Sequence, residues 1–405
     1  MNYSEAFLKL EKIDQTHLLK WYDVLKDDEK QKLLDKIELI DAKVLASNGS
    51  NKDKETISPL KTLTLPEIKE EELEDRTLGL KALKEGKLAC VLLAGGMGSR
   101  LGYSHPKGLY NIGINKTLSI FECQMNTLKE RVKECGSFIP LFIMTSPENI
   151  EETKKHFEEN DFYGYDKTYI KFFIQTEYPV TDLNGKILMT NKYTPASAPN
   201  GNGGWYLSMI NAGLDKYAKS IGVEYFNVYA VDNVLQKMAD PVFLGSIIKR
   251  GYESGAKVVK KADPDERVGV ICLANGHPSI TEYIELTDEL RFSKDENGEY
   301  LYNFGVILNY IFRVDALDRT KGNDFPIYRA NKKFPYMDDL GNTITPTENN
   351  AHKYETFVLD MVRMMNNCVS FEVDRYKEFA PVKNLHGIDS VDSARELLIK
   401  NSIDI

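Results

Sequence analysis

The stretch KLACVLLAGG, residues 87–96, decides the fold class of this 405-residue chain. It is a short apolar run that ends in glycines, which is typical of a buried parallel strand entering a loop. Other strand-like runs follow at residues 138–145, 168–175, 225–231, 256–259 and 268–272, with helical patterns between them at residues 118–134, 147–159, 204–220 and 241–254. This alternation predicts a mainly parallel α/β sheet with right-handed crossovers, which binds ligands at the carboxyl ends of its strands.

Composition narrows the functional class. The chain is 42% hydrophobic and carries a net charge of −9, so it has enough apolar residues for a large core and is a poor match to a nucleic-acid or anionic-membrane binder. Its five cysteines form no C-x-x-C pair, which argues against a zinc ribbon or a disulfide framework. The first 25 residues lack the pattern of a signal peptide, and no window resembles a membrane span. We therefore expect a cytoplasmic protein without a membrane or nucleic-acid partner.

The chain is predicted to have three consecutive parts. Residues 1–85 are expected to form a helical N-terminal segment, residues 86–375 the main α/β domain, and residues 376–405 a small C-terminal lid segment. Residues 47–58 are polar and are interpreted as a linker or loop, and the acidic run from Glu70 to Asp75 as a solvated helix face.

The loop after the first strand carries the clearest chemical signal. Its sequence LAGGMGSRLGYSHPKG, residues 93–108, offers backbone N–H groups to phosphate oxygens and adds the cations Arg100 and Lys107. Neither the dinucleotide pattern G-x-G-x-x-G nor the Walker A pattern is present. The loop therefore favours a nucleoside triphosphate, with a purely structural turn as the alternative.

These residues resemble the signature loop of eukaryotic-type UDP-N-acetylhexosamine pyrophosphorylases, a branch of the UDP-sugar pyrophosphorylases. Further motifs of that family follow in the same order over nearly the whole chain: APNGNGG at 198–204, VDN at 231–233, VGV at 268–270, TEY at 281–283, Asn303 to Asn309, and EFAPVKN at 378–384. The resemblance implies a Rossmann-like, GT-A-like nucleotidyltransferase sheet flanked by helices. Several ordered motifs are far more specific than one glycine loop.

The resemblance also implies roles for individual residues. Arg100 and Lys107 would be the catalytic cations, and Asp232 would hold Mg²⁺, for which Mn²⁺ could substitute. Without the resemblance, a capping residue at a strand end is the alternative interpretation of Asp232. The implied substrate-binding residues are Leu93, Ala94, Gly95 and Gly96 of the loop, Gln175 on the uracil, Gly201 and Asn202 at the ribose and sugar, Gly269, Glu282 and Asn303 at the sugar, and Lys383 at the sugar phosphate. The family's usual aspartate and asparagine are replaced here by Asn200 and Val306.

The implied reaction is Mg²⁺-dependent, in-line uridylyl transfer from UTP to N-acetyl-α-D-glucosamine 1-phosphate, without a covalent intermediate, by a monomer. UTP, UDP-N-acetylglucosamine, the sugar phosphate and pyrophosphate are then its ligands. Three alternatives stay open. These are a UDP-glucose or broad-specificity UDP-sugar pyrophosphorylase, a UDP-sugar sensor without turnover, and a GT-A glycosyltransferase, although the last class usually shows D-x-D where Asp232-Asn233-Val234 stands here.

Overall fold

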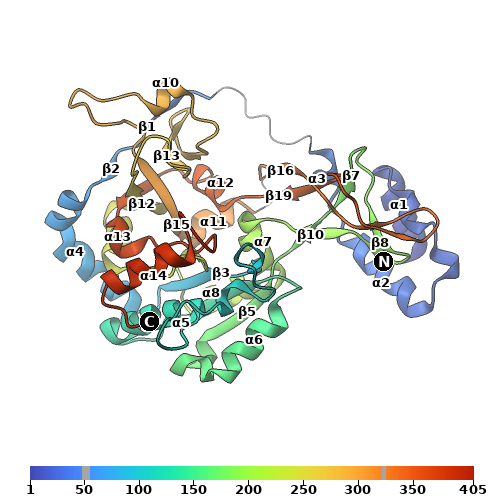
Figure 1. Ribbon diagram of the computed structural model, residues 1–405, viewed down its shortest axis with the longest axis horizontal. Coiled ribbons are helices and arrows are strands. Elements are labelled where there is room, and N and C mark those ends of the chain that lie inside the picture. The colour runs from blue at the N-terminus through green and yellow to red at the C-terminus, as the bar shows by residue number, and fades with distance from the viewer. Residues whose placement is uncertain (48–54, 322–324) are drawn as a thin grey trace. The chain divides into compact units, whose positions relative to one another are not determined.

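The computed structural model describes residues 1–47, 55–321 and 325–405, which form two compact units (Figure 1). Unit 1 consists of Met1–Asp53, Thr176–Gly204 and Asp324–Val358, and unit 2 of Lys54–Gln175, Trp205–Asn323 and Leu359–Ile405. Both units are discontinuous in sequence, and the chain does not pass between them at residues 85 or 375. Of the polar stretch interpreted as a linker, residues 48–54 lie outside the described residues.

Unit 2 contains a mixed, mostly parallel sheet, which confirms the predicted fold class. Its main strand order is β2-β20-β12-β15-β11-β3-β4-β5; β13 joins at β15 and carries β14 and β1. Only β15 runs antiparallel to its neighbours in the main order. The strands are β1 (Ile57–Pro59), β2 (Thr62–Leu63), β3 (Leu88–Leu93), β4 (Leu141–Thr145), β5 (Ile170–Ile174), β11 (Tyr225–Ala230), β12 (Ser254–Lys260), β13 (Val270–Ala274), β14 (His277–Thr281), β15 (Phe304–Arg313) and β20 (Cys368–Glu372).

Helices cover both faces of this sheet, as the sequence predicts. Leu88, Cys90 and Leu92 belong to a core shared with α5, α9 and α14, whereas on the opposite face the ring of Phe226 lies 5.8 Å from that of Trp205 in α7. Alternate strand residues thus enter two separate apolar layers. The helices are α4 (Leu65–Lys84), α5 (Ile120–Cys135), α6 (Ile150–Glu159), α7 (Trp205–Asn211), α8 (Leu214–Ser220), α9 (Pro241–Arg250), α10 (Asp288–Arg291), α11 (Val314–Arg319), α12 (Val358–Arg363), α13 (Arg375–Glu378) and α14 (Val391–Lys400).

Two local expectations are corrected. The helical pattern at 204–220 is divided into α7 and α8, because Gly213 adopts a left-handed conformation with φ of 70° that interrupts the helix. The acidic run in α4 is not solvated throughout. Asp75 is only 1% exposed, and one of its oxygens lies 3.3 Å from Nζ of Lys249 in α9.

Unit 1 begins with the predicted N-terminal helices. They pack on the segment after Gln175, because Leu10, Leu33 and Ile37 share a core with Ile187 and Met189. The helices are α1 (Tyr3–Lys12), α2 (Asp27–Glu38) and α3 (Ala42–Ala46), and the strands are β6 (Glu177–Pro179), β7 (Thr181–Asp182), β8 (Met189–Asn191), β9 (Thr194–Pro195), β10 (Ser197–Pro199), β16 (Tyr328–Lys332), β17 (Tyr336–Met337), β18 (Thr343–Ile344) and β19 (Ala351–Glu355). In neither unit do the described residues include a helix with the length and apolar character needed to span a membrane.

Candidate active site

The predicted phosphate loop leaves the sheet at the carboxyl end of β3. There the backbone N–H of Val231 donates to the carbonyl of Leu93 at 3.1 Å, and that of Ala94 donates to Met144 at 2.8 Å. The Asn149 side chain fixes the next carbonyl, since its Nδ2 donates to the oxygen of Ala94 at 3.0 Å. Leu93 and Ala94 are buried, so their expected contacts with a substrate would come from the backbone.

Gly95 and Gln175 meet at this edge of the sheet. Gln175 follows β5, is 7% exposed, and donates its backbone N–H to Thr145 at 2.7 Å. A Cβ atom on residue 95 would lie 2.8 Å from Oε1 of Gln175, so only glycine leaves that amide in place. Gly96 has open space beside it, as a backbone that approaches a base requires.

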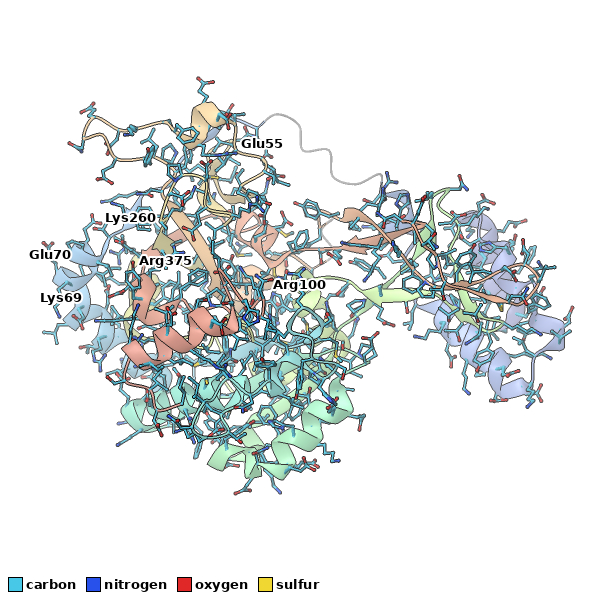
Figure 2. All side chains as sticks on the ribbon, in the orientation of Figure 1. Glu55, Lys69, Glu70, Arg100, Lys260 and Arg375 are labelled. Carbon is cyan, nitrogen blue, oxygen red and sulfur yellow. The ribbon has the colours of Figure 1, made fainter. Side chains whose placement is uncertain are left out.

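The loop closes on itself and presents its two cations. The backbone N–H of Lys107 donates to the carbonyl of Gly96 at 3.1 Å, and Met97 forms an isolated bridge with Pro106. Arg100 is exposed, lies on the 3-10 turn Ser99–Leu101 between these ends, and is labelled in Figure 2. The loop is thus a closed turn rather than a loose connection, which limits the positions open to both cations.

Lys107 faces the carboxylate that follows β11. Its Nζ lies 3.8 Å from Oδ2 of Asp232, with the two side chains 16% and 25% exposed. Burial lowers the pKa of Lys107, the neighbouring charges of Lys383 and Arg100 lower it further, and Asp232 opposes both effects. Lys107 is therefore close enough to the other two predicted cations and to the predicted metal ligand to feel the charge of each.

The segment that carries Lys383 is bound to the segment that carries Asp232. The backbone N–H of Val382 donates to the carbonyl of Asp232 at 2.8 Å. Asn233, 2% exposed, accepts from the N–H of Ala380 at 2.9 Å and donates to the carbonyl of Glu378 at 2.7 Å. These bonds bring together two motifs that lie about 150 residues apart in the sequence.

Lys383 itself is held by the turn that follows it. Its Nζ lies 2.9 Å from Oδ2 of Asp389, and its backbone N–H donates to the carbonyl of Asp389 at 2.7 Å. The lysine side chain is 39% exposed. Its ammonium can therefore exchange a carboxylate for a phosphate without first leaving a buried environment.

The residues predicted to bind the sugar flank neighbouring strands of the same sheet: Gly269 precedes β13, Glu282 follows β14 and Asn303 precedes β15. The carbonyl of Gly269 accepts from the N–H of Val306 at 2.9 Å, and a Cβ on Gly269 would lie 3.9 Å from Oε1 of Glu282. Asn303 is 9% exposed and its carbonyl accepts from Lys261. Because β15 is antiparallel, its start lies at the edge where β11 and β3 end. Val306 places methyl groups near Gly269, where the family pattern has an amide.

Gly201 and Asn202 belong to unit 1. Gly201 has a φ of 82°, and a Cβ there would lie 2.3 Å from the carbonyl oxygen of Thr356. The side-chain oxygen of Asn202 accepts from the N–H of Val358 at 2.9 Å. Asn200 is fully buried, and its carbonyl accepts from the N–H of Thr356 at 2.8 Å. This tight turn explains the glycine and gives Asn200 a structural role, whereas the ribose and sugar contacts of Gly201 and Asn202 stay a prediction.

The sequence did not reveal the residues that support the site. Asn149, Asn233 and Asp389 hold the loop, the Asp232 segment and Lys383, respectively. Asn233 was visible only as the neighbour of Asp232. Among the described residues, no three His, Cys, Asp or Glu side chains are grouped to hold a metal. A metal at Asp232 would therefore take most of its ligands from substrate oxygens and water.

Comparison with known proteins places this geometry in a family. The family model for UTP–glucose-1-phosphate uridylyltransferase matches residues 30–402. The chain is 35% identical over 416 residues to UDP-N-acetylglucosamine pyrophosphorylase of Saccharomyces cerevisiae, covering 95% of this chain and 87% of the yeast protein. It is 38% identical over 316 residues to UDP-N-acetylhexosamine pyrophosphorylase-like protein 1 of Mus musculus, covering 76% of this chain but only 62% of the mouse protein.

A solved structure of a pyrophosphorylase has the same fold. The crystal structure of the uridine diphosphate N-acetylglucosamine pyrophosphorylase from Trypanosoma brucei, in complex with an inhibitor, superimposes with a TM-score of 0.80 and 26% identity. The match covers 98% of this chain and 84% of the trypanosomal chain. On the extent of the family match and the identity to the yeast protein, the chain belongs to the UTP–glucose-1-phosphate uridylyltransferase family.

Proposed function

We propose that the chain transfers the uridylyl group of UTP to N-acetyl-α-D-glucosamine 1-phosphate, giving UDP-N-acetylglucosamine and pyrophosphate in a reversible reaction. The observation that carries the proposal is the cluster of Lys107, Asp232 and Lys383 at the carboxyl end of the sheet, beside the loop that bears Arg100. The names of the yeast and trypanosomal relatives agree with this substrate pair.

The mechanism requires positioning and charge neutralisation more than proton transfer. The attacking group is an oxygen of the sugar phosphate, which is already an anion, so no general base is needed. It must approach the α-phosphorus of UTP in line with the departing pyrophosphate. Lys383 would orient the sugar phosphate, while Arg100 and Lys107 would stabilise the charge that builds up on the leaving group.

Gln175 and the loop backbone would hold the base. The Gln175 amide offers both a donor and an acceptor, as the edge of uracil requires. The close approach of Gly95 keeps that amide at the end of β5. UTP is thereby fixed at its base and at its phosphates, which limits the motion of the α-phosphorus.

Asp232 fits a role as the protein ligand of Mg²⁺, for which Mn²⁺ would substitute. Its carboxylate is one quarter exposed, and carboxylate oxygen is the donor that Mg²⁺ prefers. Mg²⁺ bound there would neutralise phosphate charge. Lys107, 3.8 Å away, repels a cation at this carboxylate, so its removal is expected to strengthen Mg²⁺ binding.

The cysteines bear on the cellular location of the protein. All five cysteines are free and buried, which fits a reducing compartment such as the cytoplasm. We propose a monomer that binds only small molecules. Analytical ultracentrifugation at micromolar concentration tests this, and a dimer would contradict it.

The test of function is pyrophosphate release with UTP and Mg²⁺ across glucose, galactose, N-acetylglucosamine and N-acetylgalactosamine 1-phosphates. We expect release with the N-acetylated sugars, abolished by EDTA. A preference for glucose 1-phosphate would support uridylyl transfer but contradict the assignment of N-acetylglucosamine 1-phosphate as the substrate. Saturable UDP-sugar binding without release from any sugar would favour a sensor, and transfer of a sugar from UDP-sugar to an acceptor would favour a glycosyltransferase.

A further inference from the structure

A buried ion cluster lies behind the candidate site, around Lys257 of β12. Lys257 is 0% exposed, and its Nζ lies 2.7 Å from Oδ2 of Asp240, 2.7 Å from Oε2 of Glu378 and 3.2 Å from the carbonyl oxygen of Lys237. These three acceptors use all three N–H donors of the ammonium. Burying such charges costs free energy that an apolar cluster of similar volume would not, so stability is a weak explanation for the cluster.

Two of the three acceptors come from the segments that carry site residues. Lys237 follows Asp232 by five residues, and Glu378 precedes Lys383 by five residues. The carbonyl of Glu378 also accepts from the side chain of Asn233 at 2.7 Å. One buried ammonium therefore joins the segment of the expected metal ligand to the segment of the expected phosphate ligand.

The backbone around Lys257 gives independent support. The pairing of β12 with β15 shifts register at Lys257, because Ala256 opposes Tyr310 whereas Val258 opposes Val306. Within this bulge Leu308 adopts a φ of 53°, which is unfavourable for a residue with a side chain. Bulges redirect side chains and are frequent beside active sites. The sheet is thus irregular at the position that carries the ammonium.

We propose that Lys257 and Glu378 are positioning residues for uridylyl transfer, which set Lys383 relative to Asp232 without touching the substrate. This inference rests on the proposed function. Burial lowers the pKa of Lys257, but Asp240 and Glu378 outweigh burial and the pKa is raised. The lysine therefore stays charged and the cluster stays intact at neutral pH.

Glu378→Gln is the variant that tests the proposal. Lys257→Met would leave the carboxylates of Asp240 and Glu378 without their buried cation, which would destabilise the fold. Glu378→Gln keeps the shape of the side chain and an acceptor oxygen, and α13 stays attached through Arg375, whose Nη1 donates to the carbonyl of Lys260 at 3.3 Å (Figure 2). The matched control is Asp215→Asn, which neutralises another buried carboxylate, 3% exposed and 2.9 Å from Nζ of Lys321.

The kinetic test measures kcat in the wild type and in a Lys383→Ala background, under conditions where circular dichroism shows every variant folded. We expect Glu378→Gln to lower kcat about tenfold or more in the wild type, and less than about threefold once Lys383 is absent. Asp215→Asn is expected to change kcat by the same small factor in both backgrounds. An equal loss from Glu378→Gln in both backgrounds, or no loss at all, would overturn the proposal.

Amide hydrogen exchange gives a readout that does not need activity. The N–H groups of Ala380 and Val382 donate to Asn233 and Asp232, so they report the attachment of the Lys383 segment. We expect both to exchange faster in Glu378→Gln and not in Asp215→Asn. Unchanged exchange would refute the positioning role. Faster exchange in a protein that shows no pyrophosphate release would instead refute only the proposed function.

Discussion

Replacing Lys107 with methionine removes one charge from the centre of the candidate site. The Lys107 side chain is 16% exposed and its Nζ lies 3.8 Å from Oδ2 of Asp232, so the ammonium acts in a partly desolvated environment. Two unit charges about 4 Å apart interact by about 4 kcal/mol at an effective dielectric constant of about 20. Only the part of the Lys107–phosphate attraction that increases as pyrophosphate leaves affects kcat. Loss of one group that stabilises transition-state charge typically costs about 2.7–4 kcal/mol, or about 100- to 1000-fold in kcat.

The assay is steady-state pyrophosphate release over a range of UTP and Mg²⁺ concentrations. We expect kcat to fall at least about 100-fold while the KM for UTP changes by less than about tenfold. The Mg²⁺ concentration that gives half-maximal activity should decrease, because the cation next to Asp232 has been removed. Since burial lowers the pKa of Lys107, its charged form is disfavoured by folding, and the variant should not lose stability at pH 7.

Lys116→Met is the matched control for this variant. Lys116 lies nine residues after Lys107 in the sequence, its side chain is 47% exposed, and its Nζ lies 2.9 Å from Oδ2 of Asp404. The Lys116→Met substitution should leave kcat unchanged. A Lys107→Met enzyme that keeps kcat within about threefold of the wild type, or that loses only UTP affinity, would refute the electrostatic role assigned here.

Three further outcomes follow from the same geometry. Gly95→Ala should displace the Gln175 amide, which would lie 2.8 Å from the new Cβ, and we expect a higher KM for UTP and weaker discrimination against CTP in parallel assays. As the pH is raised, kcat/KM for UTP should fall at a pH below the pKa of an ordinary lysine, because the pKa of Lys107 is lowered. Lys383→Gln should move this fall to higher pH, because it removes a positive neighbour that lowers the pKa of Lys107. A shift to lower pH would contradict this prediction. Glu282→Ala should raise the KM for the sugar phosphate by about 10- to 100-fold, which corresponds to the loss of a hydrogen bond to a charged group. The KM for UTP should stay within about twofold of the wild-type value.

The fold class was predictable because it rests on local patterns. The run from Leu88 to Leu93 is apolar on both faces and is soon followed by Gly95 and Gly96, and the structure has β3 over that run. The break at Gly213 was less visible, since an isolated glycine is often tolerated inside a helical pattern. The two units could not be predicted by composition, because each is assembled from three separate stretches of sequence.

The site was predictable through motifs and not through contacts. Lys107 and Asp232 were identified from their motifs, but their 3.8 Å separation depends on the pairing of β3 with β11. Lys257 gave no signal, because a lysine in a strand pattern is expected on the surface. Its burial is explained by its two carboxylate partners, Asp240 and the distant Glu378, which lies 121 residues away in the sequence.

The most direct test of single in-line uridylyl transfer follows labelled pyrophosphate into UTP. Direct attack by the sugar phosphate on UTP predicts Mg²⁺-dependent labelling of UTP when UDP-N-acetylglucosamine is supplied, and none when UTP alone is incubated with labelled pyrophosphate. Exchange into UTP alone would demonstrate a covalent uridylyl-enzyme and contradict single in-line transfer. Absence of labelling with every UDP-sugar would contradict the assignment of this site to uridylyl transfer.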